Sequence, residues 1–481
     1  MMSLDMLQQF APVAVDMWLL IGALTILLTD LVLPPGDKRM LAWGTLLTMA
    51  VAFCGTFAFD LTGEAWGGAY VGSAHAVLLK QIFLAGGILT VLGSYKMVAE
   101  SYERRQGEFY QLLLYSLLGM TLLAGARDLI LLVVCFELMG IPLYVLAAFS
   151  RSDGRAVEGG LKLYLIGAVS SVTMLFGMSL LFGLGGTTSI SGVASYLAAH
   201  PSPLALLGVT LAITGMGFKL GVFPFHMWVP DTYESSKTPF VAFLSVAPKA
   251  AGIAALTTLL LSHGHALLNM GFVVLLTLAT STLIMGNLFA LNQSNVKRLL
   301  GYSGVAHMGF LLMALLTGSE MGIAALMFYL VGYLFTNIGT FLVVHAVAQS
   351  GGDDSVGSFE GLISRSGWLS MAMLVFQLSL AGIPFVVGFW AKLYVFMAAW
   401  LAGMYWLVVL GALLSVVALF YYLRVARAML MTEAREESKV TADTPTAVAI
   451  WVCLAMVVVM GLVPGPFVRV AEAAAAAFFG A

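Results

Sequence analysis

Charged side chains are what this sequence lacks most. Only 10% of its 481 residues are Asp, Glu, Lys or Arg, whereas soluble proteins carry about 25%. So few charges cannot cover a surface that faces water, and 61% of the residues are hydrophobic, with a mean hydropathy of +0.99. The composition excludes a soluble globular protein and indicates one that crosses a membrane many times. The net charge of −2 gives no indication of a nucleic-acid partner.

Cysteine is nearly absent too. The three cysteines, Cys54, Cys135 and Cys453, lie far apart in apolar runs, which excludes a zinc spacing, an iron–sulfur cluster and a disulfide framework. The sequence has no Walker A motif and no dinucleotide-binding G-x-G-x-x-G. Basic residues are missing before Lys38, so we expect the first apolar run to be a retained helix and not a secretory signal. We therefore predict no redox centre, metal or cofactor in this chain.

Apolar sequence is abundant, in runs of about 20 residues, the length that spans roughly 30 Å of hydrocarbon. The runs lie near 14–33, 39–59, 76–98, 109–124, 128–148, 160–184, 204–228, 238–262, 270–291, 297–318, 322–348, 367–398, 402–430 and 445–470. They predict an all-α polytopic membrane protein with about fourteen transmembrane helices. The longest polar stretches, 96–108, 349–366 and 431–444, are too short to form a soluble domain.

The basic residues predict the orientation of these helices. If the loop after the first helix is cytoplasmic, most of the 22 Lys and Arg residues fall on the cytoplasmic side: Lys38, Arg39, Lys96, Arg104, Arg105, Arg151, Arg155, Lys237, Lys297, Arg298, Arg365, Arg424, Arg427, Arg435 and Lys439. Only Arg127 and Arg469 fall on the other side. This positive-inside bias puts both termini on the periplasmic side. The Ala- and Gly-rich composition favours a bacterial inner membrane over a mitochondrial one.

A few ionisable residues remain inside the apolar runs. Glu137, Lys219, Lys249 and Lys392 lie well within predicted helices, and Lys80 and Lys162 lie within two turns of helix ends. A charge at the bilayer centre costs roughly 2.5–3.5 kcal/mol and usually belongs to an ion or proton pathway. The alternative is snorkelling, in which a long side chain carries its ammonium to the interface. We expect snorkelling for Lys80 and function for the four deeper residues, and both interpretations stay open for Lys162.

Two histidines lie beside these charges. His226 follows the seventh predicted helix's proline by two residues, and His307 lies inside the tenth. Each is either a proton relay or a neutral packing residue, and we favour the relay. A carboxylate that approaches or leaves a lysine in low dielectric makes the lysine take up or release a proton. His345 stays undecided, and the packing interpretation is favoured for His75, His200, His263 and His265.

Two of the predicted helices carry both a proline interruption and a lysine. Lys219 precedes Pro224 by five residues, and Lys392 follows Pro384 by eight. Because five helices separate them, we predict two inverted five-helix repeats, helices 4–8 and 9–13, with helices 7 and 12 discontinuous. Interrupted helices at matching places in inverted repeats indicate a transport site, whereas a plain proline kink remains the alternative for either helix alone. The expected division is 1–104, 105–265, 266–432 and 433–481, with proton uptake in the first repeat and release near Lys392.

Four motifs carry a resemblance to a known family. "GMGFKLGVFPFHMWVPDTY", "APKAAG", "NVKRLLGYSGVAHMGFLL" and "LSLAGIPFVVGFWAKLYVF" resemble the antiporter-like subunits of respiratory NADH:quinone oxidoreductase, complex I, over roughly residues 105–430. The N subunits (chain 2 in mitochondrial naming) are the most similar. The chain departs from the family at Tyr233–Pro239, "YESSKTP", where a small Gly-Ala-Pro turn is usual.

The resemblance implies roles for the buried residues. Glu137 and Lys219 would form a coupled pair, Lys249 would connect the two halves, and Lys392 would release protons. His226 and His307 would lie along the polar axis, and Lys162 would join the functional set.

The resemblance also implies a function. The chain would be a non-redox subunit of a proton-translocating NADH:quinone oxidoreductase, with flavin, iron–sulfur clusters and quinone in partner subunits. The implied partners are the antiporter-like M and L subunits, the small K, J and A type subunits, membrane lipids and protons. A subunit of a multisubunit sodium–proton antiporter is the alternative, and a purely structural helix bundle leaves the buried lysines unexplained.

Overall fold

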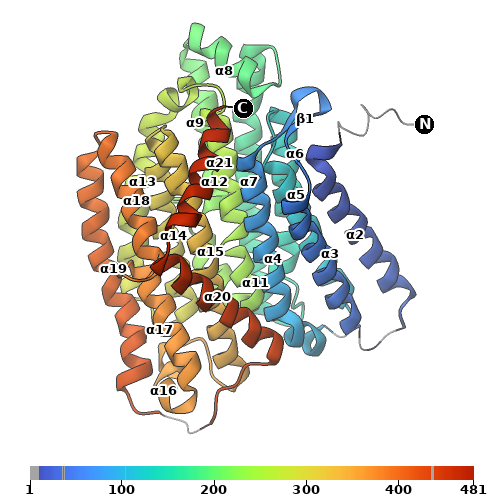
Figure 1. Cartoon of the computed structure of the whole chain (residues 1–481), viewed down its shortest axis with the longest axis vertical. Helices are drawn as coiled ribbons and strands as arrows, with labels where there is room; N and C mark the ends of the chain where they lie inside the picture. Colours follow the sequence, from blue (N-terminus) through green and yellow to red (C-terminus); the bar gives the residue numbers. More distant parts are fainter. Residues whose placement is uncertain (1–9, 35, 37, 103, 435–437, 481) are drawn as a thin grey trace.

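The computed structural model describes the chain except residues 1–9, 35, 37, 103, 435–437 and 481. Arg435 and the two terminal residues therefore lie outside the described part. The described chain is a bundle of long helices (Figure 1). Its first part contains η1 (Ala11–Val13), α2 (Ala14–Val32), α3 (Arg39–Ala58), β1 (Gly63–Ala65), η2 (Trp66–Gly68), β2 (Tyr70–Gly72), α4 (Ala74–Ser101), α5 (Gln106–Leu123), α6 (Leu129–Ala147), α7 (Gly154–Gly185) and α8 (Ile190–Ala199).

The second part continues the bundle. It contains α9 (Pro203–Leu220), α10 (Trp228–Ser235), α11 (Thr238–Leu244), α12 (Ala247–Leu261), α13 (Ala266–Leu291), α14 (Val296–Leu316), α15 (Glu320–Gln349), η3 (Val356–Phe359), α16 (Leu362–Arg365), α17 (Gly367–Ala381), α18 (Val387–Leu401), α19 (Tyr405–Met431), α20 (Thr444–Leu462) and α21 (Gly465–Phe479). The described chain begins at η1 and ends after α21 at the same end of the bundle, and α16 lies at the opposite end (Figure 1).

Twelve helices of the described chain are long and apolar enough to cross a membrane. A multi-pass membrane protein is therefore confirmed, and the difference from the expected fourteen lies in two places. The helix α5 has 18 residues but begins with the polar stretch Gln106–Glu108, which lowers its hydropathy. The expected twelfth helix is divided into α17 and α18, each of 15 residues, and neither half spans alone.

The chain leaves the helix at both proline positions expected from the sequence. After Lys219, α9 ends at Leu220 and Gly221 adopts φ +69°, a left-handed conformation that glycine accepts without strain. Pro224 lies in the following segment, before α10. In the later helix, α17 ends at Ala381, and Pro384 lies in the segment before α18.

The eighth helix is not continuous, contrary to expectation. It is divided into α11 and α12 at Ser245 and Val246, where Val246 has φ −124° and ψ −66°. Pro248 stands in the first turn of α12, where its missing N–H costs no helical hydrogen bond. Lys249 therefore lies at the start of a helix and not in the middle of one. The hairpin β1–β2 and the helices α8 and α21 were also not expected.

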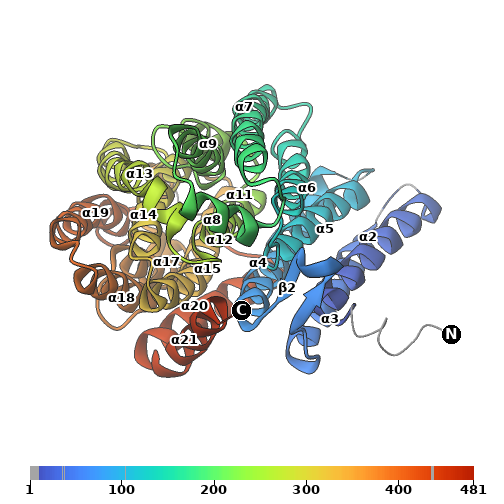
Figure 2. The same ribbon diagram turned by 90° about the horizontal axis from the view of Figure 1, so that it is seen from above.

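The most enclosed helices lie in the middle of the bundle. The span formed by α11 and α12 is completely buried, and α14 and α15 are nearly so. The view along the bundle shows α12 and α15 surrounded by the other helices, with α2 and α19 at opposite edges (Figure 2). Large apolar side chains on the outer helices are exposed, among them Leu31, Val169 and Phe420. An apolar exterior of this kind fits a lipid environment.

The prediction that Lys80 snorkels is wrong. Its side chain is only 1% exposed, and its Nζ lies 2.5 Å from the Asp16 carboxylate of α2 and 3.2 Å from the carbonyl oxygen of Pro12. Because a carboxylate on a neighbouring helix lies at the same depth, the ammonium is paired inside the protein and does not reach the interface. Asp16 lies inside the first predicted span, and the sequence analysis overlooked it.

Candidate functional site

Lys219 is buried at the end of α9, where the helix gives way to the interruption. Its Nζ donates a hydrogen bond of 2.8 Å to the hydroxyl of Tyr144 on α6 and lies 5.3 Å from the centroid of the Phe136 ring. A Cβ added to Gly140 would lie 2.0 Å from this Nζ. The glycine of α6 therefore leaves the space that the lysine head group occupies.

Glu137 lies near Lys219 without touching it. Among the described residues no ion pair joins the two side chains. Instead the Ser171 hydroxyl on α7 donates a hydrogen bond of 2.5 Å to Glu137 Oε1, and Ser171 also interacts with the Tyr144 hydroxyl. The hydroxyls of Tyr144 and Ser171, which contact the lysine and the carboxylate respectively, thus lie between these two charged groups. The sequence analysis missed both of them, although Tyr144 follows Glu137 by two helical turns.

Lys249 lies at the start of α12 and is completely buried. Its Nζ has no hydrogen-bond partner among the described residues and lies 5.6 Å from the centroid of the Tyr233 ring. A Cβ added to Gly304 would lie 2.9 Å from Lys249 Nζ and 3.1 Å from the Tyr333 hydroxyl, so the two groups converge on α14. Among the described residues this ammonium also has no carboxylate as an ion-pair partner.

His307 of α14 lies on the other side of Tyr333. The two ring centroids are 5.0 Å apart. Its Nδ1 lies 2.5 Å from the Tyr329 hydroxyl, and its Nε2 lies 3.2 Å from the Tyr422 hydroxyl. The histidine is therefore held between hydroxyls from α15 and α19. The predicted relay histidine is one member of a cluster of tyrosines that the sequence analysis did not identify.

Lys392 reaches from α18 back to the end of α17. Its Nζ donates hydrogen bonds of 3.0 and 2.9 Å to the carbonyl oxygens of Leu380 and Ala381. These are among the last carbonyls of α17, which have no partner inside their own helix. The lysine thus caps the broken helix, and a cation is favoured at this end of the helix dipole.

His226 lies in the interruption after α9 and is buried among aromatic rings. Its ring stacks on that of Phe289, with 5.8 Å between the ring centroids, and its centroid lies 6.0 Å from that of the Tyr302 ring. Its Nδ1 has no hydrogen-bond partner among the described residues. Within that part of the chain no hydrogen bond joins His226 to Lys219, Lys249 or His307, so its relay role stays a prediction.

A polar cavity of about 1010 Å³ opens at the end of the bundle that carries α16. Its charged lining consists of Glu100, Asp153, Glu158, Asp231, Glu234, Asp353, Asp354, Arg155, Lys162, Lys237, Lys297 and Arg298. The carboxylates outnumber the cations, so the mouth of the cavity attracts positive charge. The basic members of the lining, apart from Lys162, all belong to the set expected on the cytoplasmic side.

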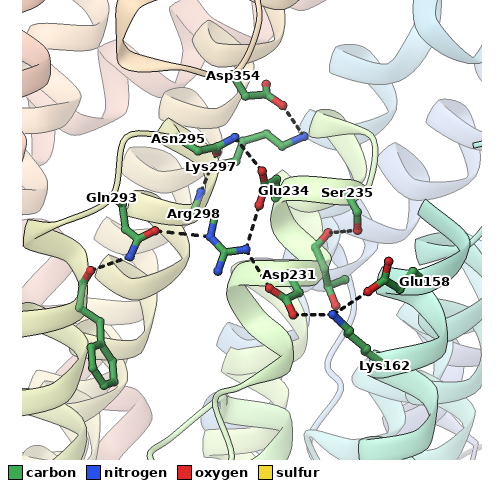
Figure 3. A network of polar contacts seen from close by, with 12 residues as sticks. Glu158, Lys162, Asp231, Glu234, Ser235, Gln293, Asn295, Lys297, Arg298 and Asp354 are labelled. Atoms are coloured by element: carbon green, nitrogen blue, oxygen red, sulfur yellow. Dashed lines mark hydrogen bonds and ion pairs between the residues drawn. The ribbon is translucent and has the colours of Figure 1, made fainter. Parts of the chain in front are cut away.

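Lys162 belongs to this cavity and not to the buried lysines (Figure 3). Its Nζ lies 2.9 Å from Glu158 and 2.9 Å from Asp231 of α10. Arg298 of α14 bridges Asp231 and Glu234 at 2.8 Å each. Burial by itself would raise the pKa of Asp231, but the hydrogen bonds from Lys162 and Arg298 outweigh it and hold that pKa below its ordinary value. The network joins α7, α10 and α14 beside the interruption of the seventh helix.

We predict that Asp231→Asn lowers the free energy of unfolding, and that this loss is the same at every pH near neutrality. A carboxyl whose pKa is lowered on folding contributes stability above its unfolded pKa and loses it as the pH falls through the folded pKa. Asp231 is partly exposed, so the loss is about 1 kcal/mol or less. Thermal unfolding of the purified protein in detergent at pH 6 and pH 8 measures it. A difference between variant and parent that changes between these two pH values would contradict the assignment.

Among the described residues, no group of three or more His, Cys, Asp or Glu side chains is placed to hold a metal ion. The titratable groups that the structure brings together here are lysines, carboxylates, histidines and tyrosine hydroxyls. Side chains of these types, when they lie inside a membrane protein, usually belong to ion or proton pathways.

A family model described as "NADH:quinone oxidoreductase/Mrp antiporter, TM" matches residues 126–418. The chain belongs to this family. The matched segment contains Glu137, Lys219, Lys249, His307 and Lys392, whereas Asp16 and Lys80 lie before it. The resemblance noted from the four motifs is thereby confirmed.

Relatives within the family point to one type of subunit. Subunit N of the NADH-quinone oxidoreductase of Moorella thermoacetica is 38% identical over 459 residues, which cover 95% of this chain and 96% of the relative. Subunit 2 of the NAD(P)H-quinone oxidoreductase of a Synechococcus species is 41% identical over 380 residues, or 78% of this chain and 71% of the relative.

Solved structures give the same fold. A chain of respiratory complex I from Thermus thermophilus with bound aureothin has a TM-score of 0.80 and 31% identity, and the match covers 95% of this chain and 99% of that one. A chain of the Mrp complex from Dietzia sp. DQ12-45-1b has a TM-score of 0.85 at 17% identity, covering 98% of each. The second likeness shows a shared fold only.

Proposed function

We propose that this chain is a proton-translocating membrane-arm subunit of an NADH:quinone oxidoreductase. Electron transfer from NADH to quinone in other subunits drives protons outward through this one. The observation that carries the proposal is the series of buried lysines, Lys219, Lys249 and Lys392, each placed where a helix is interrupted. Such interruptions expose backbone groups that water satisfies and lipid does not, so water and titratable groups meet at three places along the bundle.

The proposed architecture is fourteen spans. Adding α5 and the divided pair α17–α18 to the twelve candidate helices gives this number. The inverted five-helix repeats would occupy 105–265 and 266–432, after an N-terminal segment of three helices (1–104) and before a last transmembrane helix (433–481). The interruptions at Pro224 and Pro384 would then be equivalent positions of the two repeats.

Each site residue has a proposed role in proton transfer. A carboxylate near a lysine favours its charged form. Movement of Glu137 relative to Lys219 through the Ser171–Tyr144 connection would load and unload that lysine. Lys249 would pass the proton by way of Tyr333 to the His307 cluster, and Lys392 would release it.

The remaining candidates have supporting roles. His226 would contact the water in the first interruption, and Lys162 would control the cavity through its ion pairs. The predicted partners are M-, L-, K-, J- and A-type subunits, and the flavin, iron–sulfur clusters and quinone would belong to other subunits. The proposed location is a bacterial inner membrane with both termini on the periplasmic side.

Lys249→Leu tests the proposed function. Leucine fills a similar space but cannot hold a proton, so we expect proton pumping by the assembled enzyme to fall by about tenfold or more. The measurement is the acidification of inside-out vesicles on addition of NADH, divided by the amount of assembled enzyme. Pumping at the parent rate would refute the proposal.

A subunit of a multisubunit sodium–proton antiporter is the second candidate, because the Mrp chain shares the fold. The two differ in what drives transport. Sodium addition without NADH would move protons across vesicles that contain an antiporter, whereas the oxidoreductase subunit needs NADH and quinone.

A further inference from the structure

The cavity at the α16 end stops at His345, a buried residue near the end of α15. The imidazole lines the cavity, and its side chain is only 5% exposed. Its Nε2 is buried and has no hydrogen-bond partner among the described residues. His345 therefore lies at the boundary between the cavity and the buried interior of the bundle.

Polar side chains continue from His345 along the same helix. Asn337, Tyr333 and Tyr329 follow at spacings of eight, four and four residues, a stripe that winds around α15 by about 40° for every four residues. The amide nitrogen of Asn337 donates a hydrogen bond of 2.6 Å to the Ser245 hydroxyl. Ser245 stands in the interruption between α11 and α12, one turn before Lys249. The stripe therefore leads from the cavity to the lysine.

Tyr233 lies beside this stripe and belongs to α10, which also carries the charged lining of the cavity. The centroid of its ring lies 5.9 Å from that of Phe341, which is one turn from His345 on α15. The ammonium of Lys249 lies 5.6 Å from the centroid of the same ring. The Tyr233 hydroxyl is thus enclosed between the cavity end of α15 and Lys249.

The polar atoms along this line have no partners in the described protein. They are His345 Nε2, Asn337 Oδ1, Tyr233 Oη, Tyr333 Oη and Lys249 Nζ. A buried polar group without a partner costs roughly 1–3 kcal/mol, and buried polar sites of this kind are normally satisfied by ordered water. Four such atoms, together with the Nζ of Lys249 itself, fit a hydrated path that joins the polar cavity to this lysine.

We propose that His345 takes up protons from the α16-end cavity and that these protons reach Lys249 along α15, a second uptake route beside the one expected in the first repeat. The cavity carboxylates gather protons, and one passes from cavity water to a ring nitrogen of His345. The imidazolium releases its proton from the other nitrogen to water beside Asn337 and Tyr233, and that water protonates neutral Lys249. His345 returns to its neutral form, so the step is balanced. The inference rests on the proposed proton-translocating function.

The test compares two substitutions at His345 in the assembled enzyme. His345→Leu removes the titratable ring, and His345→Gln keeps polarity without titrating in this range. A positioned proton-transfer group typically contributes factors of about 10² or more, and water retains part of the path, so we expect about tenfold slower NADH-driven proton pumping in both variants. Because proton uptake then limits the rate, the ratio of rates in H₂O and D₂O should rise, which a purely structural defect does not cause.

The matched control is His75→Leu. His75 of α4 is also fully buried, and neither of its ring nitrogens has a partner among the described residues. It lies next to Phe478 of α21, away from the cavity. We expect its substitution to leave pumping within about twofold of the parent, because loss of a packing histidine affects stability and not proton transfer.

A labelling experiment tests access without relying on activity. In a Cys54→Ser background, His345→Cys should react with a charged maleimide in inside-out vesicles and stay unlabelled in right-side-out vesicles. Two results overturn the uptake route and leave the proposed function standing: no labelling from the cytoplasmic side, or parent-level pumping in both His345 variants while Lys249→Leu loses it. Unchanged pumping in Lys249→Leu overturns the proposed function itself.

Discussion

Lys219→Ala is expected to lower the rate of proton pumping by the assembled enzyme about tenfold or more. Alanine cannot hold a proton, and its methyl group leaves the Tyr144 hydroxyl without the donor that lies 2.8 Å away. The connection from Glu137 through Ser171 and Tyr144 then ends in an apolar space. Acidification of inside-out vesicles and quinone reduction, measured on the same preparation, show whether coupling or electron transfer is lost.

The comparison needs a lysine outside the pathway. Lys439, between α19 and α20, is exposed and does not belong to the lining of the α16-end cavity. Lys439→Ala should pump at the parent rate. Tyr144→Phe removes one hydroxyl and keeps the ring beside Lys219, so an intermediate loss is expected. If Lys219→Ala pumps as well as Lys439→Ala, Lys219 has no part in transport.

The second large effect is expected on stability. Asp16→Asn keeps the shape of the side chain but leaves the Lys80 ammonium buried without its carboxylate, which lies at 2.5 Å. Removing one partner of a buried ion pair costs about 3–5 kcal/mol. We therefore expect a markedly lower midpoint of thermal unfolding in detergent and less subunit in the membrane. The measurements are a melting curve and the amount of assembled complex.

The double variant Asp16→Leu, Lys80→Met separates stability from transport. Replacing a buried pair by apolar residues of similar size is often neutral or stabilising, so this variant should be more stable than Asp16→Asn and should pump normally. A stable double variant that no longer pumps would contradict the structural role and would add the pair to the proton pathway.

Three of the buried lysines could be identified from the sequence, because an ionisable group in the middle of a long apolar run is evident from its neighbours. Lys219, Lys249 and Lys392 are all buried as expected. The proline positions also predicted where the chain leaves the helix, because a proline in a helix interior removes a hydrogen bond and clashes with the preceding turn. Both properties are local, and they do not depend on which helices become neighbours.

The partners of these charges were not predictable in the same way. Tyr144, Ser171 and Tyr333 are common residues in apolar helices. Only the packing of α6, α7 and α15 against their neighbours brings them close to Lys219, Glu137 and Lys249 respectively. Asp16 was overlooked, and Lys80 was assigned to the interface, because the residue that pairs with it lies 64 positions earlier in the chain. The division at Val246 was missed because Pro248 occupies a helix start, where proline is tolerated.

By itself, the sequence determined that the protein crosses a membrane many times, that Lys219, Lys249 and Lys392 remain inside it and where two helices are interrupted. These features follow from hydropathy and backbone chemistry along one stretch of chain. Only the tertiary structure decided how the charges are connected. It placed two hydroxyls between Glu137 and Lys219, enclosed His307 among tyrosines, gathered Lys162 and Arg298 around Asp231, and aligned His345 with Lys249. Hydrogen bonds extend about 3 Å, and contacts on that scale between separate helices depend on packing that no single segment specifies.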